Sequence, residues 1–234
     1  HALDHGGEPL LLALDAAGHE GVSITCVEEA EPLGTAGAIK FAQEHLDERF
    51  LVLNGDTLAD YDLSAEIAQH AATGARATLA LVPVEDPTAY GVVLTDDQKR
   101  VEAFLEKPSR EDAPADPRIN AGAYVLEREV LEMIPAGENR SFEHDVFPQL
   151  VRAGISAYDA EGYWLDLGTP ERYVLATRDL LAGTVHSYLD DLRDQSGNVV
   201  APDVTLDGVE LTAPVVIGPG AKIGHGSRLG PDTV

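Results

Sequence analysis

A six-residue repeat runs through the last eighteen residues of the chain. From Ile217 the sequence reads I-G-P-G-A-K, I-G-H-G-S-R, L-G-P-D-T-V, so an aliphatic residue followed by glycine recurs at 217, 223 and 229. Six residues are too few for a helical repeat and suit one flat face of a parallel β-helix. We therefore expect 199–234 to form part of a β-helix. Because the repeat stops at Val234 and residue 1 is not Met, we also expect the chain to be a fragment.

The chain is strongly acidic, with a net charge of -25 from 41 Asp and Glu against 16 Lys and Arg. Such a charge repels nucleic acid and anionic membranes, so we expect neither as a partner. No apolar run approaches the roughly 20 residues of a membrane span. The single cysteine, Cys26 in V-S-I-T-C-V, excludes an internal disulfide and fits a reducing compartment. We expect a cytoplasmic protein with Cys26 buried in the core.

Helical and strand patterns alternate along most of the chain. Expected helices cover 8–18, 36–45, a stretch from 64, 141–154 and 170–183, and expected strands cover 22–27, 50–53, 77–84, 91–95, 101–106, 119–126 and 156–160. This alternation predicts an α/β fold, with a Rossmann-like, mixed but mostly parallel sheet flanked by helices. The polar stretch 184–198 then reads as a linker between a domain over 1–183 and the repeats from 199.

Two carboxylates follow buried strands. Asp56 ends V-L-N-G-D, and Asp166 lies in Y-W-L-D-L. Ligands bind at the carboxyl ends of strands in open α/β sheets, and hard divalent cations need such oxygen ligands. Each segment is equally an ordinary turn, since Asn-Gly is a turn signal and Asp166 precedes the helix start at Thr169-Pro170. The residues alone leave both interpretations open.

Two further segments suit a phosphorylated ligand. In L-G-T-A-G (33–37), glycine lets a flat ligand approach the backbone where helix-initial N–H groups point outward, unless the segment is only a tight turn. In F-L-E-K-P, Glu106 can hydrogen-bond two hydroxyls and Lys107 can neutralise a phosphate, unless this is merely a strand end stopped by Pro108.

The order of these motifs is more specific than any one of them. The series L-G-T-A-G, L-N-G-D, Y-G-V-V, E-K-P, I-N-A-G, S-F-E-H-D-V-F-P and W-L-D-L-G-T-P, followed by hexapeptide repeats, resembles the sugar-1-phosphate nucleotidyltransferases. The mannose-1-phosphate guanylyltransferase type is the most similar, from about residue 20 onward. The resemblance implies a nucleotidyltransferase domain, here without its first strand, and then the start of a left-handed parallel β-helix.

The resemblance implies an enzyme that joins a nucleoside triphosphate to a sugar 1-phosphate and releases pyrophosphate, for nucleotide-sugar biosynthesis. By the same resemblance, Asp56 and Asp166 would hold Mg²⁺ and Lys107 would contact the sugar phosphate. The positions that match the sugar-binding and base-binding residues of the family are Gly91, Glu106, Asn120 and Glu143 for the sugar, and Gly34 and Thr35 for the base.

The base-reading side chain of the family lies five positions before the glycine of L-G-T, which is Glu29 here. A carboxylate accepts from both N1–H and the 2-amino group of guanine, whereas uracil and thymine offer it only N3–H. This favours GTP as the nucleotide and, with the mannose type, mannose 1-phosphate as the sugar. Glu31 is an alternative to Glu29, and thymidylyl or uridylyl transfer to glucose 1-phosphate is an alternative reaction.

One part of the family pattern has no match. The glycine-rich loop whose Arg and Lys grip the triphosphate is absent, so we infer truncation and expect the isolated 234 residues to have negligible activity. The alternative of another class is a regulatory subunit that binds nucleotide sugars without turnover, although the presence of Asp56, Asp166 and Lys107 argues for catalysis. An acyltransferase that uses His225 is disfavoured, because that histidine stands alone in the repeats and a surface position suits it better. An open β-helix end needs covering, which predicts a homo-oligomer for the full-length protein.

Overall fold

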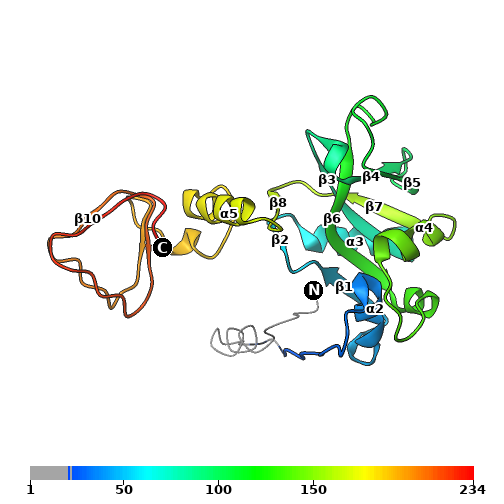
Figure 1. Cartoon of the computed structure of the whole chain (residues 1–234), viewed down its shortest axis with the longest axis horizontal. Coiled ribbons are helices and arrows are strands. Elements are labelled where there is room, and N and C mark those ends of the chain that lie inside the picture. The colour runs from blue at the N-terminus through cyan, green and yellow to red at the C-terminus, as the bar shows by residue number, and fades with distance from the viewer. Residues whose placement is uncertain (1–20, 22) are drawn as a thin grey trace. The chain divides into compact units, whose positions relative to one another are not determined.

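The computed structural model describes residue 21 and residues 23–234, and the predicted helix over 8–18 lies outside them. The described backbone forms two compact units (Figure 1). The first unit contains the described residues up to Gly55 together with Leu63–Ala160, and the second unit contains Asp56–Asp62 and Glu161–Val234. The predicted boundaries at residues 183 and 199 both fall inside the second unit, and a domain end at either position stays a prediction.

The first unit is built on one six-stranded sheet. Its strands are β1 (Arg49–Leu53), β3 (Ala77–Pro83), β4 (Gly91–Thr95), β5 (Val101–Glu106), β6 (Arg118–Glu127) and β7 (Ile155–Asp159). Their order is β5-β4-β6-β3-β7, with β1 paired to β6 outside this path. The long β6 therefore lies at the centre, with β3 along one edge and both β4 and β1 along the other.

The α/β class with a mixed sheet is confirmed, but the expectation of a mostly parallel sheet was wrong. Among the described strands of this sheet, β3 and β7 form the one parallel pair, and the other pairings are antiparallel. The pairings show that β1, β3, β4 and β7 all run in the same direction. The reversed strand β6 inserts between β3 on one side and β1 and β4 on the other, which makes their pairings antiparallel.

Short helical segments connect these strands. They are α2 (Gly34–Phe41), α3 (Leu63–Thr73), α4 (Phe147–Leu150), a π-helical turn (Phe142–Val146) before α4, and 3₁₀ segments at Gln43–His45, Pro87–Ala89 and Arg128–Met133. The expected helix start at Ser141 is confirmed, because its hydroxyl accepts a hydrogen bond from the His144 N–H at 3.3 Å.

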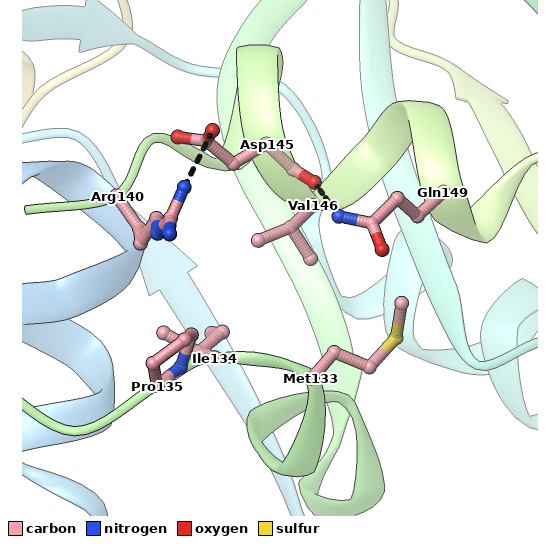
Figure 2. Close-up of a pocket in the computed structure, with 7 residues that line it drawn as sticks. All are labelled: Met133, Ile134, Pro135, Arg140, Asp145, Val146 and Gln149. Atoms are coloured by element: carbon pink, nitrogen blue, oxygen red, sulfur yellow. Dashed lines mark hydrogen bonds and ion pairs between the residues drawn. The ribbon is translucent and has the colours of Figure 1, made fainter. Parts of the chain in front are cut away.

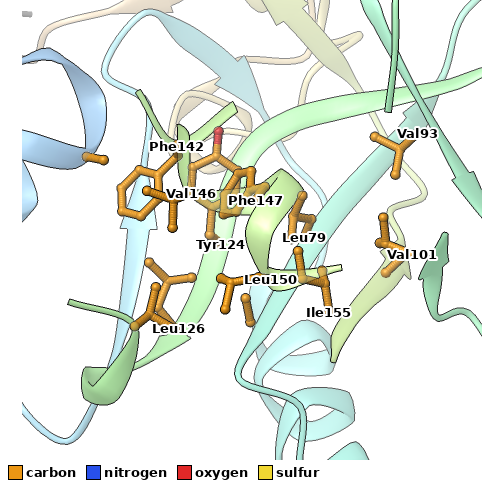
Figure 3. Close-up of a cluster of buried hydrophobic side chains, with 14 of the residues drawn as sticks. Leu79, Val93, Val101, Tyr124, Leu126, Phe142, Val146, Phe147, Leu150 and Ile155 are labelled. Carbon is orange, nitrogen blue, oxygen red and sulfur yellow. The ribbon is translucent and has the colours of Figure 1, made fainter. Parts of the chain in front are cut away.

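The apolar core lies between the sheet and the segment 142–151 (Figure 3). Phe142 and Phe147 stack with ring centroids 5.3 Å apart, and the Tyr124 ring meets Phe147 edge-on at 5.0 Å. Leu79 and Leu126 extend the cluster from β3 and β6. Alternate strand residues share one face of a sheet, so the intervening positions face the other side.

The other face of the sheet meets α3 through polar side chains. His70 Nδ1 lies 2.8 Å from Thr78 Oγ1, and its Nε2 lies 3.1 Å from Glu127 Oε1. Gln69 donates to the carbonyl of Ala157. Glu66 is fully buried and neither carboxyl oxygen has a hydrogen-bond partner, so burial raises the pKa of this carboxyl to about 7.

In the second unit, β2 (Thr57–Ala59) pairs antiparallel with β8 (Trp164–Asp166), and α5 (Pro170–Ala182) follows. The Thr169 hydroxyl accepts from the Arg172 N–H at the start of α5, and Gly183 ends the helix with φ 75°. Both helix ends match the sequence expectation, because a hydroxyl satisfies an orphan N–H and glycine tolerates the left-handed conformation.

The polar stretch 184–198 is anchored to the end of α5 and contains a 3₁₀ segment, Asp190–Leu192. The Arg193 guanidinium donates to the carbonyls of Leu180 and Leu181 at 2.6 and 2.7 Å. Beyond it, β9 (Val199–Val200) pairs parallel with β11 (Val216–Ile217), and β10 (Glu210–Leu211) with β12 (Arg228–Leu229). The paired residues are seventeen or eighteen positions apart, about the length of three six-residue repeats. The β-helix and its hand stay predictions.

The predicted strand over 22–27 was wrong for the part that the structure describes, where residues 23–29 form no strand. Cys26 is exposed rather than buried, and Ile24 and Val27 beside it are exposed as well. A strand needs a paired neighbour, and none of the described strands pairs with this segment. In the described part of the chain, no helix has the length and apolar character needed to cross a membrane.

Candidate functional site

The glycines of the L-G-T-A-G segment make room for another part of the backbone. Gly34 has φ +70°, and a Cβ atom there would lie 2.5 Å from the carbonyl oxygen of Arg140. The same carbonyl accepts hydrogen bonds from the N–H groups of Ala36 and Gly37, at 2.9 and 3.3 Å. These helix-initial donors therefore do not point outward as the sequence suggested. A role of Gly34 in nucleotide binding stays a prediction.

Glu29 lies four residues before Leu33, the first residue of the L-G-T-A-G segment. Its Oε2 accepts a hydrogen bond from the Leu33 N–H at 3.0 Å, and its side chain is half-buried. Glu31 is exposed. The Leu33 contact ties the Glu29 carboxylate to the residue that precedes α2, while the assignment of Glu29 to the guanine base stays a prediction.

Thr35 connects the predicted base segment to a predicted sugar residue. Its hydroxyl accepts from the Phe142 N–H at 2.9 Å and donates to Glu143 Oε2 at 3.2 Å. Thr35 and Glu143 are 108 positions apart in the sequence. The fold thus brings them into direct contact, although the motif positions alone implied different roles for them.

Glu143 is the centre of a network of hydroxyl groups. Besides Thr35, its carboxylate accepts from Ser141 Oγ at 2.7 Å and from the Tyr124 hydroxyl at 2.9 Å. The Tyr124 oxygen in turn accepts from Asn120 Nδ2 at 2.7 Å.

Sequence reasoning missed Tyr124. The Asn120 and Tyr124 side chains meet because the ladder is irregular between them: Leu79 pairs with Tyr124 and Leu81 with Asn120, so a step of four residues on β6 faces a step of two on β3. A regular strand would hold the two side chains apart, so the sequence contained no signal for this contact.

A cross-strand row continues from Asn120. Gly91 on β4 pairs with Glu106 on β5, and the pairing of Val92 with Ile119 places Gly91 next to Asn120 in the antiparallel register. A Cβ atom at Gly91 would lie 3.3 Å from Glu106 Oε2. Glycine therefore leaves no side chain between the Glu106 carboxylate and the Asn120 amide, and a role of the Gly91 backbone in sugar binding stays a prediction.

Lys107 ends this row in a strained backbone conformation. Its φ is +42°, in a region that non-glycine residues seldom adopt, and its N–H donates to the Tyr90 carbonyl at 3.0 Å. Its Nζ lies 3.9 Å from Glu106 Oε1, and the side chain is 64% exposed. Strained backbones concentrate at functional sites. The predicted sugar and phosphate residues thus form one continuous series within the first unit.

The two predicted metal carboxylates belong to adjoining segments of the second unit: Asp166 ends β8, and Asp56 directly precedes β2. Thr57 pairs with Asp166 across β2 and β8, and the Leu167 N–H donates to the Asp56 carbonyl at 2.8 Å. The fold thus brings the segments that hold Asp56 and Asp166 side by side although 110 residues separate these aspartates in the sequence, and Asp56 itself lies opposite Leu167. Asp56 and Asp166 both belong to the second unit, so the backbone contact between their segments lies within that unit.

Asp166 already has hydrogen-bond donors on both oxygens. Its Oδ1 accepts from the Gly168 N–H and its Oδ2 from Arg172 Nη1, each at 2.7 Å. No group of three or more His, Cys, Asp or Glu side chains suited to a metal ion occurs in the part of the chain described. Mg²⁺ is usually held by one or two carboxylates, with phosphate oxygens and water completing its shell. Two aspartates meet that requirement by number, and a shared metal site at Asp56 and Asp166 stays a prediction.

A separate pocket of about 170 Å³ lies in the first unit (Figure 2). Its lining residues are Met133, Ile134, Pro135, Arg140, Asp145, Val146 and Gln149. Arg140 Nη1 and Asp145 Oδ1 are 3.4 Å apart, and Gln149 donates to the Asp145 carbonyl. None of the predicted site residues lines this pocket, so it does not belong to the series described above.

Comparison with known proteins gives independent evidence on the family to which this chain is similar. The family described as nucleotidyl transferase matches residues 8–183. A mannose-1-phosphate guanylyltransferase of Mycobacterium tuberculosis is 42% identical over 215 residues, which are 89% of this chain and 58% of that protein. HddC of Yersinia pseudotuberculosis superposes with a TM-score of 0.62 at 29% identity, and its complex with GMP-PN with 0.60 at 27%, each over 73% of both chains. The chain spans little more than half the length of the curated relatives that it matches.

Proposed function

The chain belongs to the nucleotidyl transferase family, and we propose that the whole protein transfers GMP from GTP to mannose 1-phosphate, which yields GDP-mannose and pyrophosphate. The observation that carries this proposal is the continuous series in the first unit, from Thr35 through Glu143, Tyr124 and Asn120 to Glu106. It presents hydroxyl-binding groups beside a lysine, which is the chemistry of a sugar phosphate. The 42% identical relative named above supports the choice of mannose and guanine.

The reaction is a phosphoryl transfer. An oxygen of the sugar phosphate attacks the α-phosphorus of GTP in line, and the bond from that phosphorus to the pyrophosphate oxygen breaks. The attacking oxygen is already anionic, so the reaction needs no general base. The protein contributes by positioning the two substrates and by neutralising the charge that gathers between their phosphates.

In this proposal Lys107 neutralises the phosphate of the sugar substrate, and the exposure of its side chain leaves it accessible. Glu106 and Glu143 accept hydrogen bonds from sugar hydroxyls, and Asn120 donates one. The absence of a side chain at Gly91, between Glu106 and Asn120, supports an approach of the sugar to the backbone there. Each of these contacts uses a residue of the first unit that belongs to the row at Gly91 or to the hydroxyl network around Glu143.

Asp56 and Asp166 hold Mg²⁺ in this proposal, and the ion, when bound, supplies positive charge to the phosphates. The pairing of β2 with β8, which brings the segments that hold these two aspartates side by side, supports this assignment. Arg172 must release Asp166 Oδ2 before this oxygen can bind the ion, because Arg172 donates a hydrogen bond to it.

In this proposal Glu29 binds the guanine base, and Gly34 and Thr35 contact the same base. The contact of Glu29 with the Leu33 N–H uses one of about four acceptor positions of the carboxylate, which leaves acceptors for the N1–H and the amino group of guanine. The relative solved with GMP-PN is consistent with this choice. Glu31 is the residue to compare in the same assay.

The test is a matrix assay with the full-length protein. Four nucleoside triphosphates and several sugar 1-phosphates are combined with Mg²⁺, and pyrophosphate release is measured. We expect GTP with mannose 1-phosphate to give the highest kcat/KM, and Asp56→Asn or Asp166→Asn to abolish release. Higher turnover with UTP or dTTP contradicts the base assignment. Binding of nucleotide sugar without any release indicates a regulatory subunit instead.

Two further properties of the whole protein belong to this proposal. We place the protein in the cytoplasm, where GTP and sugar phosphates are available, and we expect a homo-oligomer joined through the repeat region. Light scattering of the full-length protein, compared with a variant cut before residue 199, tests the assembly. An unchanged mass after this deletion contradicts a role of the repeats in assembly.

A further inference from the structure

We propose that Tyr124 is a positioning residue for the sugar substrate, because it sets the hydrogen-bonding direction of both Asn120 and Glu143. The inference rests on the proposed function, since it names the residue that orients two of the proposed sugar contacts. Tyr124 is 1% exposed, so its hydroxyl acts through these two side chains rather than on the substrate. Neither the motif series nor the family assignment singles out this residue.

The hydroxyl of Tyr124 has one proton, and its two partners decide where that proton goes. A carboxylate only accepts, so the Tyr124 O–H donates to Glu143 Oε1 at 2.9 Å. Asn120 must then donate its Nδ2–H to the phenolic oxygen, at 2.7 Å. An independent contact agrees, because Asn120 Oδ1 accepts from the Gly122 N–H at 3.0 Å. The orientation of the Asn120 amide is thereby fixed on both sides.

A count of the remaining positions shows what this arrangement offers to a ligand. A carboxylate accepts about four hydrogen bonds, and Glu143 already receives three, from Tyr124, Ser141 and Thr35. One acceptor position remains, on Oε1, the oxygen that faces Tyr124. Asn120 retains one N–H donor and one acceptor position. The pair thus presents two acceptors and one donor, with Glu143 on one side of the Tyr124 hydroxyl and Asn120 on the other, which suits hydroxyl groups of a sugar.

The ring of Tyr124 and its hydroxyl have separable roles. The ring packs against Phe142 and Phe147, with centroids 5.9 and 5.0 Å away, and belongs to the apolar core. Phenylalanine at this position keeps these contacts and removes only the hydroxyl. Without it, Glu143 loses one of its three donors and the Asn120 amide loses one of its two contacts, so both groups are held less firmly.

The experiment compares Tyr124→Phe with wild type in the full-length protein, with KM and kcat measured for each substrate by pyrophosphate release. We expect the KM for mannose 1-phosphate to rise about tenfold, because a hydrogen bond to a charged group is lost, while the KM for GTP changes less than about twofold. Tyr173→Phe on α5 is the matched control, since this tyrosine is 64% exposed. The thermal midpoint of each variant reports whether the core is intact.

A double-mutant cycle with Glu143→Gln distinguishes positioning from a general loss of structure. If Tyr124 acts through Glu143, the effect of Tyr124→Phe on the sugar KM shrinks to about threefold or less in the Glu143→Gln background. Should Tyr124→Phe not fold, Thr35→Val removes another of the three donors at an exposed position. We expect it to raise the sugar KM about threefold and Thr35→Ser to restore it.

The outcomes separate this inference from the proposed function. A wild-type protein that is inactive with every sugar 1-phosphate overturns both. A wild-type protein that is active, together with an unchanged sugar KM in Tyr124→Phe, overturns only the role of Tyr124. Equal increases in KM for both substrates, or independent effects in the double mutant, also overturn it. If the matrix assay favours another sugar 1-phosphate, the same variants are compared with that sugar.

Discussion

Arg172 Nη1 donates to Asp166 Oδ2 at 2.7 Å, across the short turn that joins β8 to α5. Asp166 is one of the two proposed metal ligands, so a divalent cation and the guanidinium compete for the same oxygen. Both side chains are about one-third exposed, and ion pairs of this kind contribute only modestly. The pair is therefore weak enough for a metal to displace it.

The first prediction concerns this competition. Arg172→Gln removes the competing cation, and we expect Mn²⁺ to bind the full-length protein about threefold to tenfold more tightly, measured by calorimetry. Arg178→Gln is the matched control, because Arg178 lies on the same helix and pairs with Asp232. Asp166→Asn should abolish the binding. Unchanged or weaker Mn²⁺ binding in Arg172→Gln contradicts the competition.

The second prediction concerns the close contact at Gly34. Gly34→Ala forces a Cβ atom to within 2.5 Å of the Arg140 carbonyl at φ +70°, whereas Gly137 has a similar φ of +75° and open space around it. We expect Gly137→Ala to lower the free energy of unfolding by about 1 kcal/mol and Gly34→Ala by about 2 kcal/mol more. Urea denaturation of both variants measures the difference. Equal losses contradict the packing role of Gly34.

The third prediction concerns the strained backbone of Lys107. Lys107→Gly and Lys107→Ala both remove the ammonium group, so each should raise the KM for mannose 1-phosphate at least about tenfold. Only glycine relieves the positive φ, and we expect the Gly variant to be more stable than the Ala variant by about 1 kcal/mol. Thermal unfolding of the two variants checks this difference. Equal stability means that φ +42° carries no strain.

The fourth prediction is a pH dependence of stability from Glu66. Burial raises the pKa of this carboxyl to about 7 from 4.5, so the folded state keeps its proton to higher pH than the unfolded state does. The resulting stability is fully present below pH 4.5 and is lost as the pH rises to about 7, and it is constant above that. The size of the change is on the order of 3 kcal/mol.

The measurement follows the unfolding free energy of wild type and Glu66→Gln between pH 4 and pH 8, and uses their difference. Burial lowers the pKa of His70, which acts in the opposite direction over part of this range, but His70 is present in both proteins and cancels. Glu132→Gln, at an exposed carboxyl, is the control. A difference that does not change with pH contradicts the protonation of buried Glu66.

Some of the site was predictable because its residues belong to local motifs. Glu106 and Lys107 are neighbours in the chain, and the pairing of Gly91 with Glu106 follows from two adjacent strands joined by a turn. Tyr124 was not predictable in its role, since its link to Glu143 joins strand β6 to the π-helical turn. A tyrosine in an apolar strand has the same sequence pattern whether its hydroxyl binds a partner or not.

The sequence by itself determined the features that depend on short-range geometry: the capped helix from Pro170 to Ala182, the hairpin of β4 and β5, and the ordered motifs of the nucleotidyl transferase family. Only the tertiary structure decided that β6 runs reversed at the centre of the sheet, that Cys26 is exposed, and that the segments holding Asp56 and Asp166 lie side by side. Backbone sterics and capping act within a few residues, whereas strand order and side-chain networks depend on contacts between segments about 100 residues apart.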